Sequence, residues 1–387
     1  MTSNGIFGST FERGWQIGLL DDTSWLAALV EVETALMRAA QLAGAVPESA
    51  AATILERWTN LEIDLEEIGR RAGAGGNPVI PLAAMLKATL GPDLRDYVHL
   101  GATSQDILDT ACMLLARRAM SVVIGHLRAA AGHAADLAAE HASTRMAGRT
   151  LLQNALPITF GLKAATWTAG LDGAIARLGR VSADLPVQYA GPVGTFSGSN
   201  GHGPAIRREL AGLLQLADTE LAWHTVRLPI ADLAGALGTA AGIVGKVALD
   251  VVLLAQSATS EVGEGQAPGD TERRGGSSSM PHKHNPVAAI SARACSMRTP
   301  GLVATLFAAM PQEHERAAGA WHSEWETLAD LLRLTGSAAA WLSESLQYLV
   351  VDAAAMARAA QQMPPGEGDA HELTMMALAQ RTNEEMP

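Results

Sequence analysis

The sequence predicts an all-α protein whose centre is a bundle of long helices. Alanine is the commonest residue in the 387-residue chain, and aromatic residues make up only 4% of it. Alanine and leucine are strong helix formers, so this composition favours closely packed helices. Long apolar stretches, separated by short segments rich in glycine and proline, favour the same fold class. The length suffices for two or three domains around a sizeable core.

The first hundred residues are expected to hold an arm followed by several helices. The glycine-rich segment that opens the sequence should form the arm. A helix is predicted to follow Asp21, a candidate N-cap, and to run to Gln41. Further helices are expected near Glu48 and Asp64, and a short one is expected to open at Pro81.

Two longer helices are predicted in the middle of the chain. One should run from the segment at Thr103 to Glu140. The other, residues 229–260, is apolar enough and long enough to span a membrane. Glycine and alanine dominate it, however, and it is interrupted by charges at Asp232, Lys246 and Asp250. We therefore expect the buried centre of a large soluble bundle. One subunit could hardly cover so much apolar helix, which predicts self-association.

Charge and cysteine content exclude several classes of function. The formal net charge of −12 argues against a nucleic-acid-binding surface, and an anionic substrate would need a local cationic pocket. Cys112 and Cys295 stand in apolar runs without metal-ligand spacing, so both are expected to be core residues. We expect no metal, no cofactor and no membrane partner. No secretory signal pattern opens the sequence, which predicts a reduced, cytoplasmic protein.

The strongest functional signal lies in residues 275–286, Gly-Gly-Ser-Ser-Ser-Met-Pro-His-Lys-His-Asn-Pro. Glycines let the backbone approach a ligand closely, and three successive hydroxyls break the helical pattern. Free backbone N–H groups, hydroxyls and the cation of Lys283 suit binding a carboxylate and stabilising a developing oxyanion. A flexible linker is the alternative, but linkers seldom carry Met-Pro-x-Lys-x-Asn-Pro.

At these residues the sequence resembles the fumarase/aspartase superfamily, which includes adenylosuccinate lyase, argininosuccinate lyase and 3-carboxy-cis,cis-muconate cycloisomerase. The match covers residues 276–285 with few wildcards. The resemblance implies a three-domain all-α fold whose long helices assemble into the twenty-helix core of a homotetramer. The domains are expected at residues 1–98, 99–350 and 351–387. The resemblance also assigns the site residues of this loop: Ser277 as the catalytic serine, with Ser278, Met280, Lys283 and Asn285 around the substrate.

A second segment, residues 99–106, precedes the long helix that ends at Glu140. Thr103 or Ser104 could cap that helix, and a carboxylate would be favoured at its N-terminus. An ordinary helix cap is the alternative reading of the residues alone. The resemblance implies that Thr103 and Ser104 bind substrate carboxylates, and that His99 lines the same site.

A third segment, residues 146–157, resembles the superfamily motif Gly-Arg-Thr-His-x-Gln. The resemblance implies that Arg149, Thr150 and Gln153 contact the substrate. Leu151 stands where the lyases place a catalytic histidine, and a leucine cannot transfer a proton.

Residues 312–325 resemble the carboxymuconate cycloisomerases more closely than the adenylosuccinate lyases. Arg316 is expected to pair with a substrate carboxylate, because a guanidinium binds carboxylates through two hydrogen bonds. An amphipathic helix with a solvated face is the alternative. Arg227 could add to the cationic set. His224 matches a family position, although a packed structural histidine is equally open.

The superfamily reaction makes or breaks a bond β to a carboxylate through an aci-carboxylate intermediate, which needs preorganised donors and cations. Ser277 would exchange the proton, its alkoxide supported by loop N–H groups and Lys283. In a lactonising cycloisomerase the group that leaves in the reverse direction is a carboxylate, which is stable without a proton. The replacement at Leu151 is therefore tolerable there. The predicted function is 3-carboxy-cis,cis-muconate cycloisomerase acting on a tricarboxylate; the alternatives are an adenylosuccinate-type lyase and a non-catalytic structural protein.

Overall fold

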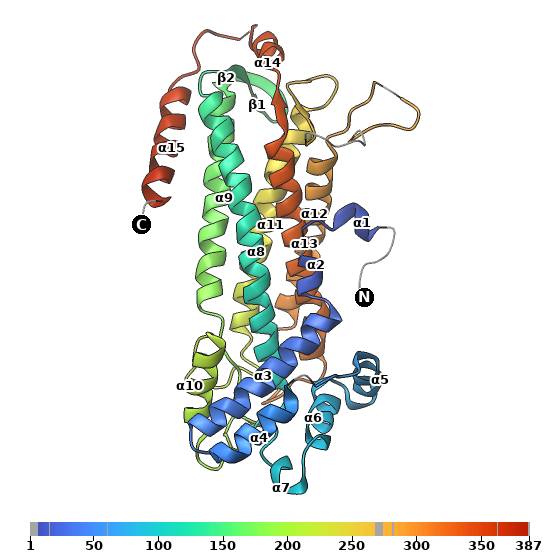
Figure 1. The fold of residues 1–387 in the computed structure, drawn as a ribbon. Coiled ribbons are helices and arrows are strands. Elements are labelled where there is room, and N and C mark those ends of the chain that lie inside the picture. The colour runs from blue at the N-terminus through green and yellow to red at the C-terminus, as the bar shows by residue number, and fades with distance from the viewer. Residues whose placement is uncertain are drawn as a thin grey trace.

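Long helices dominate the computed structural model, which describes residues 7–14, 16–59, 61–267, 274–280, 282–361 and 363–385. They run up and down in one antiparallel bundle (Figure 1). Its members are α8 (Ser104–Glu140), α9 (Phe160–Ala183), α11 (Leu228–Leu254), α12 (Val287–Ala308) and α13 (Ala320–Gln347). The prediction of an all-α bundle is confirmed.

The helices of the N-terminal region lie across the lower end of this bundle (Figure 1). They are α3 (Asp22–Leu42), α4 (Glu48–Trp58), α5 (Leu65–Gly75), α6 (Val79–Ala88) and α7 (Pro92–Arg95), and α10 (Gly203–Leu214) lies beside them. Two short turns of helix, α1 (Gly8–Phe11) and α2 (Gln16–Leu19), interrupt the predicted arm.

One start signal read from the sequence is used by the structure, and another is displaced by two residues. Asp21 caps α3 by accepting a hydrogen bond of 2.8 Å from the backbone N–H of Ser24. The helix predicted to open at Pro81 begins two residues earlier, because the Asn77 side chain accepts from the backbone N–H of Val79 at 3.1 Å.

Two small antiparallel sheets of two strands each were not predicted. Strands β1 (Arg145–Thr150) and β2 (Gln153–Thr159) join α8 to α9, and β3 (Val262–Glu264) pairs with β4 (Leu349–Val351). The glycine-rich segment 261–276, which precedes the serine-bearing motif, begins with β3 and is fixed there by pairing with β4. Residues 268–273 of that segment lie outside the described residues.

The C-terminal region consists of α14 (Ala353–Ala360) and α15 (Ala370–Glu385). The first expected domain boundary falls between α7 and α8, and the second falls inside β4. The division into three domains stays a prediction.

Helix α11 is long and apolar enough to cross a membrane by length and composition. It packs against α9, α12 and α13, with Leu233, Leu237 and Val244 fully buried. It is thus a core helix of the bundle, as predicted. Five of its residues are exposed: Leu228, Asp232, Thr239, Gly242 and Lys246.

Candidate active site

The predicted site residues fall into two groups at opposite ends of the bundle (Figure 1). One group surrounds the start of α8 at the lower end and contains His99, Thr103 and Arg316. The other lies at the upper end, in the β1–β2 turn and in the loop that precedes α12. Helix α8 has 37 residues, so its ends are about 55 Å apart at 1.5 Å per residue. One chain cannot present both groups to one small substrate.

At the lower end, Arg316 lies against the first turn of α8. Its Nη1 donates to Thr103 Oγ1, and its guanidinium lies 5.7 Å from the centre of the Trp321 ring. Partial burial lowers the pKa of Arg316, an effect opposed by the nearby carboxylates of Asp106 and Asp109. The predicted neighbours Thr103 and Arg316 are therefore brought together by the fold, with Ser104 following at the first position of α8.

Asp106 fixes the start of α8 to two other segments. It accepts hydrogen bonds from the backbone N–H of Thr103 at 3.0 Å and of Gly191 at 2.9 Å. Its Oδ1 lies 2.7 Å from Nε2 of His224. Both Asp106 and His224 are buried, so within the chain His224 is a packed histidine that holds the site's frame.

One turn further along α8, a buried network of four charged and polar side chains surrounds Arg227. Arg227 donates to Asp109 at 2.7 Å and to Glu324 at 2.6 Å. Asp109 also accepts from Trp321 Nε1 at 2.9 Å, and Glu324 from Gln312 Nε2 at 2.9 Å. The side chain of Arg227 is only 1% exposed. This arrangement corrects the suggestion that Arg227 adds to the substrate's cationic set. Its guanidinium N–H groups already donate to two carboxylates of its own chain.

His99, in the loop before α8, pairs with a buried carboxylate of α3. Its Nδ1 lies 2.6 Å from Glu33 Oε1. Burial lowers the pKa of His99, but the charge of Glu33 and its hydrogen bond outweigh burial, so the pKa is raised overall. The residue adopts a left-handed backbone conformation, with φ of 61°.

At the upper end, the β1–β2 hairpin exposes two leucines at its tip. Leu151 is 96% and Leu152 76% exposed, and they form a two-residue turn with φ of 51° and 64°. Thr150 and Gln153 flank this turn. Arg149 is held by Glu261 through hydrogen bonds of 2.7 and 2.8 Å, so its charge is already balanced within the chain.

The loop before α12 presents Ser277 with backbone donors already in place. Ser277 Oγ accepts from the N–H of Met280 at 3.2 Å and of Ser279 at 3.4 Å. Asn285 closes the loop, because its backbone N–H and its Nδ2 both donate to Gly275 O at 3.0 Å. Lys283 and Ser278 are exposed beside them. Pro281 of the motif lies outside the described residues.

Sequence reasoning missed the carboxylates and the amide behind these groups: Glu33, Asp106, Asp109, Glu324 and Gln312. A signal was present in α8, where Asp106 and Asp109 interrupt an otherwise apolar, buried stretch. Several of their partners, among them Gly191, Arg227 and Trp321, lie 85 or more residues away along the chain, so no local pattern could name them.

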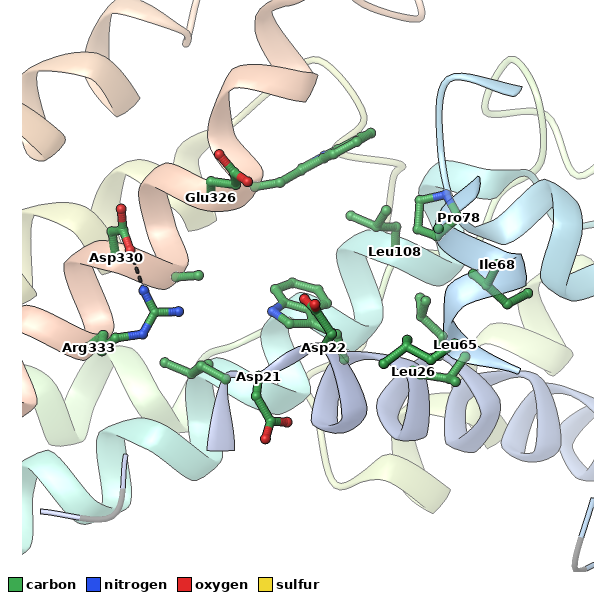
Figure 2. A pocket seen from close by; sticks show the side chains of 16 residues that line it. Asp21, Asp22, Leu26, Leu65, Ile68, Pro78, Leu108, Glu326, Asp330 and Arg333 are labelled. Atoms are coloured by element: carbon green, nitrogen blue, oxygen red, sulfur yellow. Dashed lines mark hydrogen bonds and ion pairs between the residues drawn. The ribbon is translucent and has the colours of Figure 1, made fainter. Parts of the chain in front are cut away.

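A pocket of about 490 Å³ opens between α3, α5, α8 and α13 (Figure 2). Asp21, Asp22 and Glu326 lie around it, and Arg333 is ion-paired with Asp330 there. None of the predicted site residues lines it. The pocket and the candidate chemistry are therefore separate features of the lower end.

The comparison with known proteins decides the family. A family model described as lyase matches residues 16–301. The chain belongs to this lyase family. It is thus an enzyme of the cycloisomerase and lyase type, in the fumarase/aspartase superfamily that its loop motif indicated.

Relatives and a solved structure are similar over most of the chain. The nitrosuccinate lyase of Streptomyces davaonensis is 43% identical over 86% of this chain and 72% of its own length. The 3-carboxy-cis,cis-muconate cycloisomerase of Bradyrhizobium diazoefficiens is 43% identical over 87% and 74%. The 3-carboxy-cis,cis-muconate lactonizing enzyme of Pseudomonas putida superposes with a TM-score of 0.86 at 35% identity, covering 99% of this chain and 89% of that one.

Replacing Arg227 should destabilise the bundle strongly. In Arg227→Gln the two carboxylates stay buried without their cation, which we expect to lower the free energy of unfolding by about 3–5 kcal/mol. Urea denaturation followed by tryptophan fluorescence measures this. The control Arg70→Gln removes an exposed ion pair with Glu67 on α5 and should cost at most about 1 kcal/mol. Equal losses in both variants would contradict the role assigned to the buried network.

A methyl group at Gly275 should open the Ser277 loop. Gly275 has φ of +72°, and a Cβ there would lie 2.2 Å from Asn285 O. We expect Gly275→Ala to speed hydrogen exchange at the Asn285 amide by roughly tenfold or more, since left-handed alanine costs about 1–2 kcal/mol. Gly263→Ala, where a Cβ meets open space, is the matched control. Unchanged exchange in Gly275→Ala would show that the loop is not held by this contact.

Proposed function

We propose that the protein is a 3-carboxy-cis,cis-muconate cycloisomerase, a cytoplasmic enzyme that forms 4-carboxymuconolactone during the degradation of protocatechuate. The observation that carries this proposal over an adenylosuccinate-type lyase is Leu151 at the tip of the β1–β2 hairpin, in a chain that keeps the expected Ser277, Lys283 and Arg316. The tip has no group that can donate a proton to a leaving nitrogen. Lactone formation and its reversal need none there, because the oxygen involved is a carboxylate.

In the proposed reaction, a substrate carboxylate oxygen adds to the alkene carbon β to another carboxylate. Negative charge then develops on that second carboxylate, where Lys283 and Asn285 would stabilise it. Ser277 would transfer the proton to the α carbon. Two backbone N–H groups already donate to its Oγ, which is the arrangement that a serine alkoxide requires. Arg316 and the N-terminus of α8 would hold a further carboxylate.

We also propose that each site is assembled from several chains of a homotetramer. The support is the length of α8, which separates Thr103 and Arg316 from the Ser277 loop within one chain. Copies packed antiparallel along the bundle would bring the upper end of one chain to the lower end of another. Thr239 and Gly242, two exposed small residues of α11, leave room for a helix of another chain.

A lyase acting on nitrosuccinate is the second candidate, favoured by the equal identity of the Streptomyces relative. A nitro group that leaves as an anion would need no acid either, so Leu151 does not separate the two. An adenylosuccinate-type lyase is less well supported, since its nitrogen leaving group benefits from an acid at this position.

Loss of 3-carboxymuconate absorbance, followed with purified protein, tests the function. We expect Ser277→Ala to lower kcat by about 10²–10⁴-fold, the usual contribution of a general acid or base. Lys283→Ala should lower it by about 10²–10³-fold. Ser279→Ala, in the same loop, keeps its backbone N–H and should stay near the wild-type rate. Turnover of nitrosuccinate or adenylosuccinate in place of 3-carboxymuconate would replace the proposed substrate, and no turnover of any would favour a structural role.

Mixing two inactive variants tests the shared site. Lys283→Ala damages the upper group and Arg316→Ala the lower group, so a mixed oligomer contains some sites with neither defect. Refolding the two together in equal amounts should restore activity to roughly a quarter of the wild-type value, if each site takes the two groups from different chains. The double variant Lys283→Ala/Arg316→Ala, mixed with wild type at the same ratio, controls for refolding yield. No gain above the separate variants would mean that the groups do not meet between chains.

A further inference from the structure

Glu33 is a buried carboxylate with one partner. It lies on the core side of α3, where the residue is 1% exposed among buried apolar neighbours such as Val32 and Leu36. Its Oε1 contacts His99 Nδ1 at 2.6 Å, whereas its Oε2 has no hydrogen-bond partner among the described residues. An ionised carboxylate is costly to bury without a cation. A negative charge on Glu33 therefore favours a positive charge on His99, its hydrogen-bonded neighbour.

The backbone holds the His99 ring in one place. A left-handed conformation is uncommon for a residue with a side chain, and histidine and asparagine adopt it more readily than most. The adjoining loop is fixed as well, because Tyr189 Oη donates to Leu100 O at 3.0 Å. A Cβ on Gly101 would lie 2.7 Å from that same Oη, so the loop has little room to shift. The ring keeps 17% of its surface exposed, and the described residues offer it no second hydrogen bond.

His99 is itself part of the lower group of site residues. His99 stands four residues before Thr103, which binds Arg316. The charge of Asp106 acts on both His99 and Arg316. The chain has a net charge of −12, so it repels an anionic substrate at long range. A fixed cation at His99 would attract such a substrate locally.

We propose that Glu33 is a positioning residue that keeps His99 as an imidazolium beside Thr103 and Arg316, where it binds one carboxylate of the substrate. The inference rests on the proposed function only for the number of carboxylates that the substrate carries. Substrate binding should consequently weaken as the pH rises, and the charge of Glu33 sets the pH at which this weakening begins.

The sign of this pH dependence follows from the groups that face His99. Burial lowers the pKa of His99, Glu33 on α3 and Asp106 on α8 raise it, and Lys87 on α6 lowers it; the sum is a raised pKa. The cation is present below that raised pKa and is lost as the pH rises through it. Without the charge of Glu33, the cation is lost at a lower pH.

Calorimetric titration with propane-1,2,3-tricarboxylate, a tricarboxylate that cannot react, tests the inference in the intact oligomer. Titrations between about pH 6 and pH 9, in two buffers of different ionisation enthalpy, report affinity and proton uptake together. For the wild type we expect affinity to fall with rising pH, and proton uptake on binding in the range where the fall occurs.

Three variants separate the charge from the fold. Glu33→Gln keeps a hydrogen-bond acceptor for Nδ1 but loses the charge, so the fall in affinity should move to lower pH. His99→Asn suits the left-handed backbone and should abolish the proton uptake, with binding weakened roughly tenfold at the acidic end. His202→Asn is the control, since His202 Nδ1 contacts only the backbone oxygen of Ala43, at 2.8 Å. It should leave both curves unchanged.

A second measurement on the same variants needs no ligand. The pKa of His99, followed by NMR with histidine labelled at Cε1, should be lower in Glu33→Gln than in the wild type. Identical pH profiles in Glu33→Gln and wild type, or persisting proton uptake in His99→Asn, would overturn the inference. So would failure of the wild type to bind the tricarboxylate at any pH. Binding that follows the expected profile in a protein that does not turn over 3-carboxymuconate would instead reject the proposed function and leave this inference in place.

Discussion

One guanidinium holds the lower end of the bundle together. Arg227 stands at the N-cap position of α11 and is shared by Asp109 of α8 and Glu324 of α13, with the Trp223 ring 4.8 Å from its charge. Burial raises the pKa of Glu324, and Arg227 acts against that rise. Three helices of the bundle thus meet at Arg227. Their ends cannot slide past one another without separating opposite charges that are buried away from water. Arg316 depends on this point indirectly, because Trp321 beneath it donates to Asp109.

Local chemistry made most of the helices predictable. Asp21 and Thr103 stand at helix starts because their side chains and the first turns satisfy one another, and that information is contained in a few adjacent residues. Strands β1 and β2 were not predicted, because they contain glycine, proline and exposed polar residues in place of alternating apolar and polar residues. The second sheet pairs β3 with β4, two strands that lie 87 residues apart along the chain.

The site was predictable only where a motif is continuous in sequence. The Ser277 loop is such a motif, and its resemblance to a known superfamily named its residues. The partner of Arg149 lies 112 residues away at Glu261, and that of His99 lies 66 residues away at Glu33. Nothing in a local pattern distinguishes an arginine that will meet a substrate from one that will be neutralised by its own chain. Only the packing of the helices makes that distinction.

The leucine turn between β1 and β2 has a consequence for how this family diversifies. Two leucines in left-handed conformations strain the turn, and their side chains gain almost no burial within the chain to offset that strain. Folding alone would favour asparagine or glycine there. The stability of a single chain therefore gives no reason for leucine at either position. Because the tip makes little contact with the core, a substitution there leaves the bundle in place, which suits a scaffold shared by lyases and cycloisomerases.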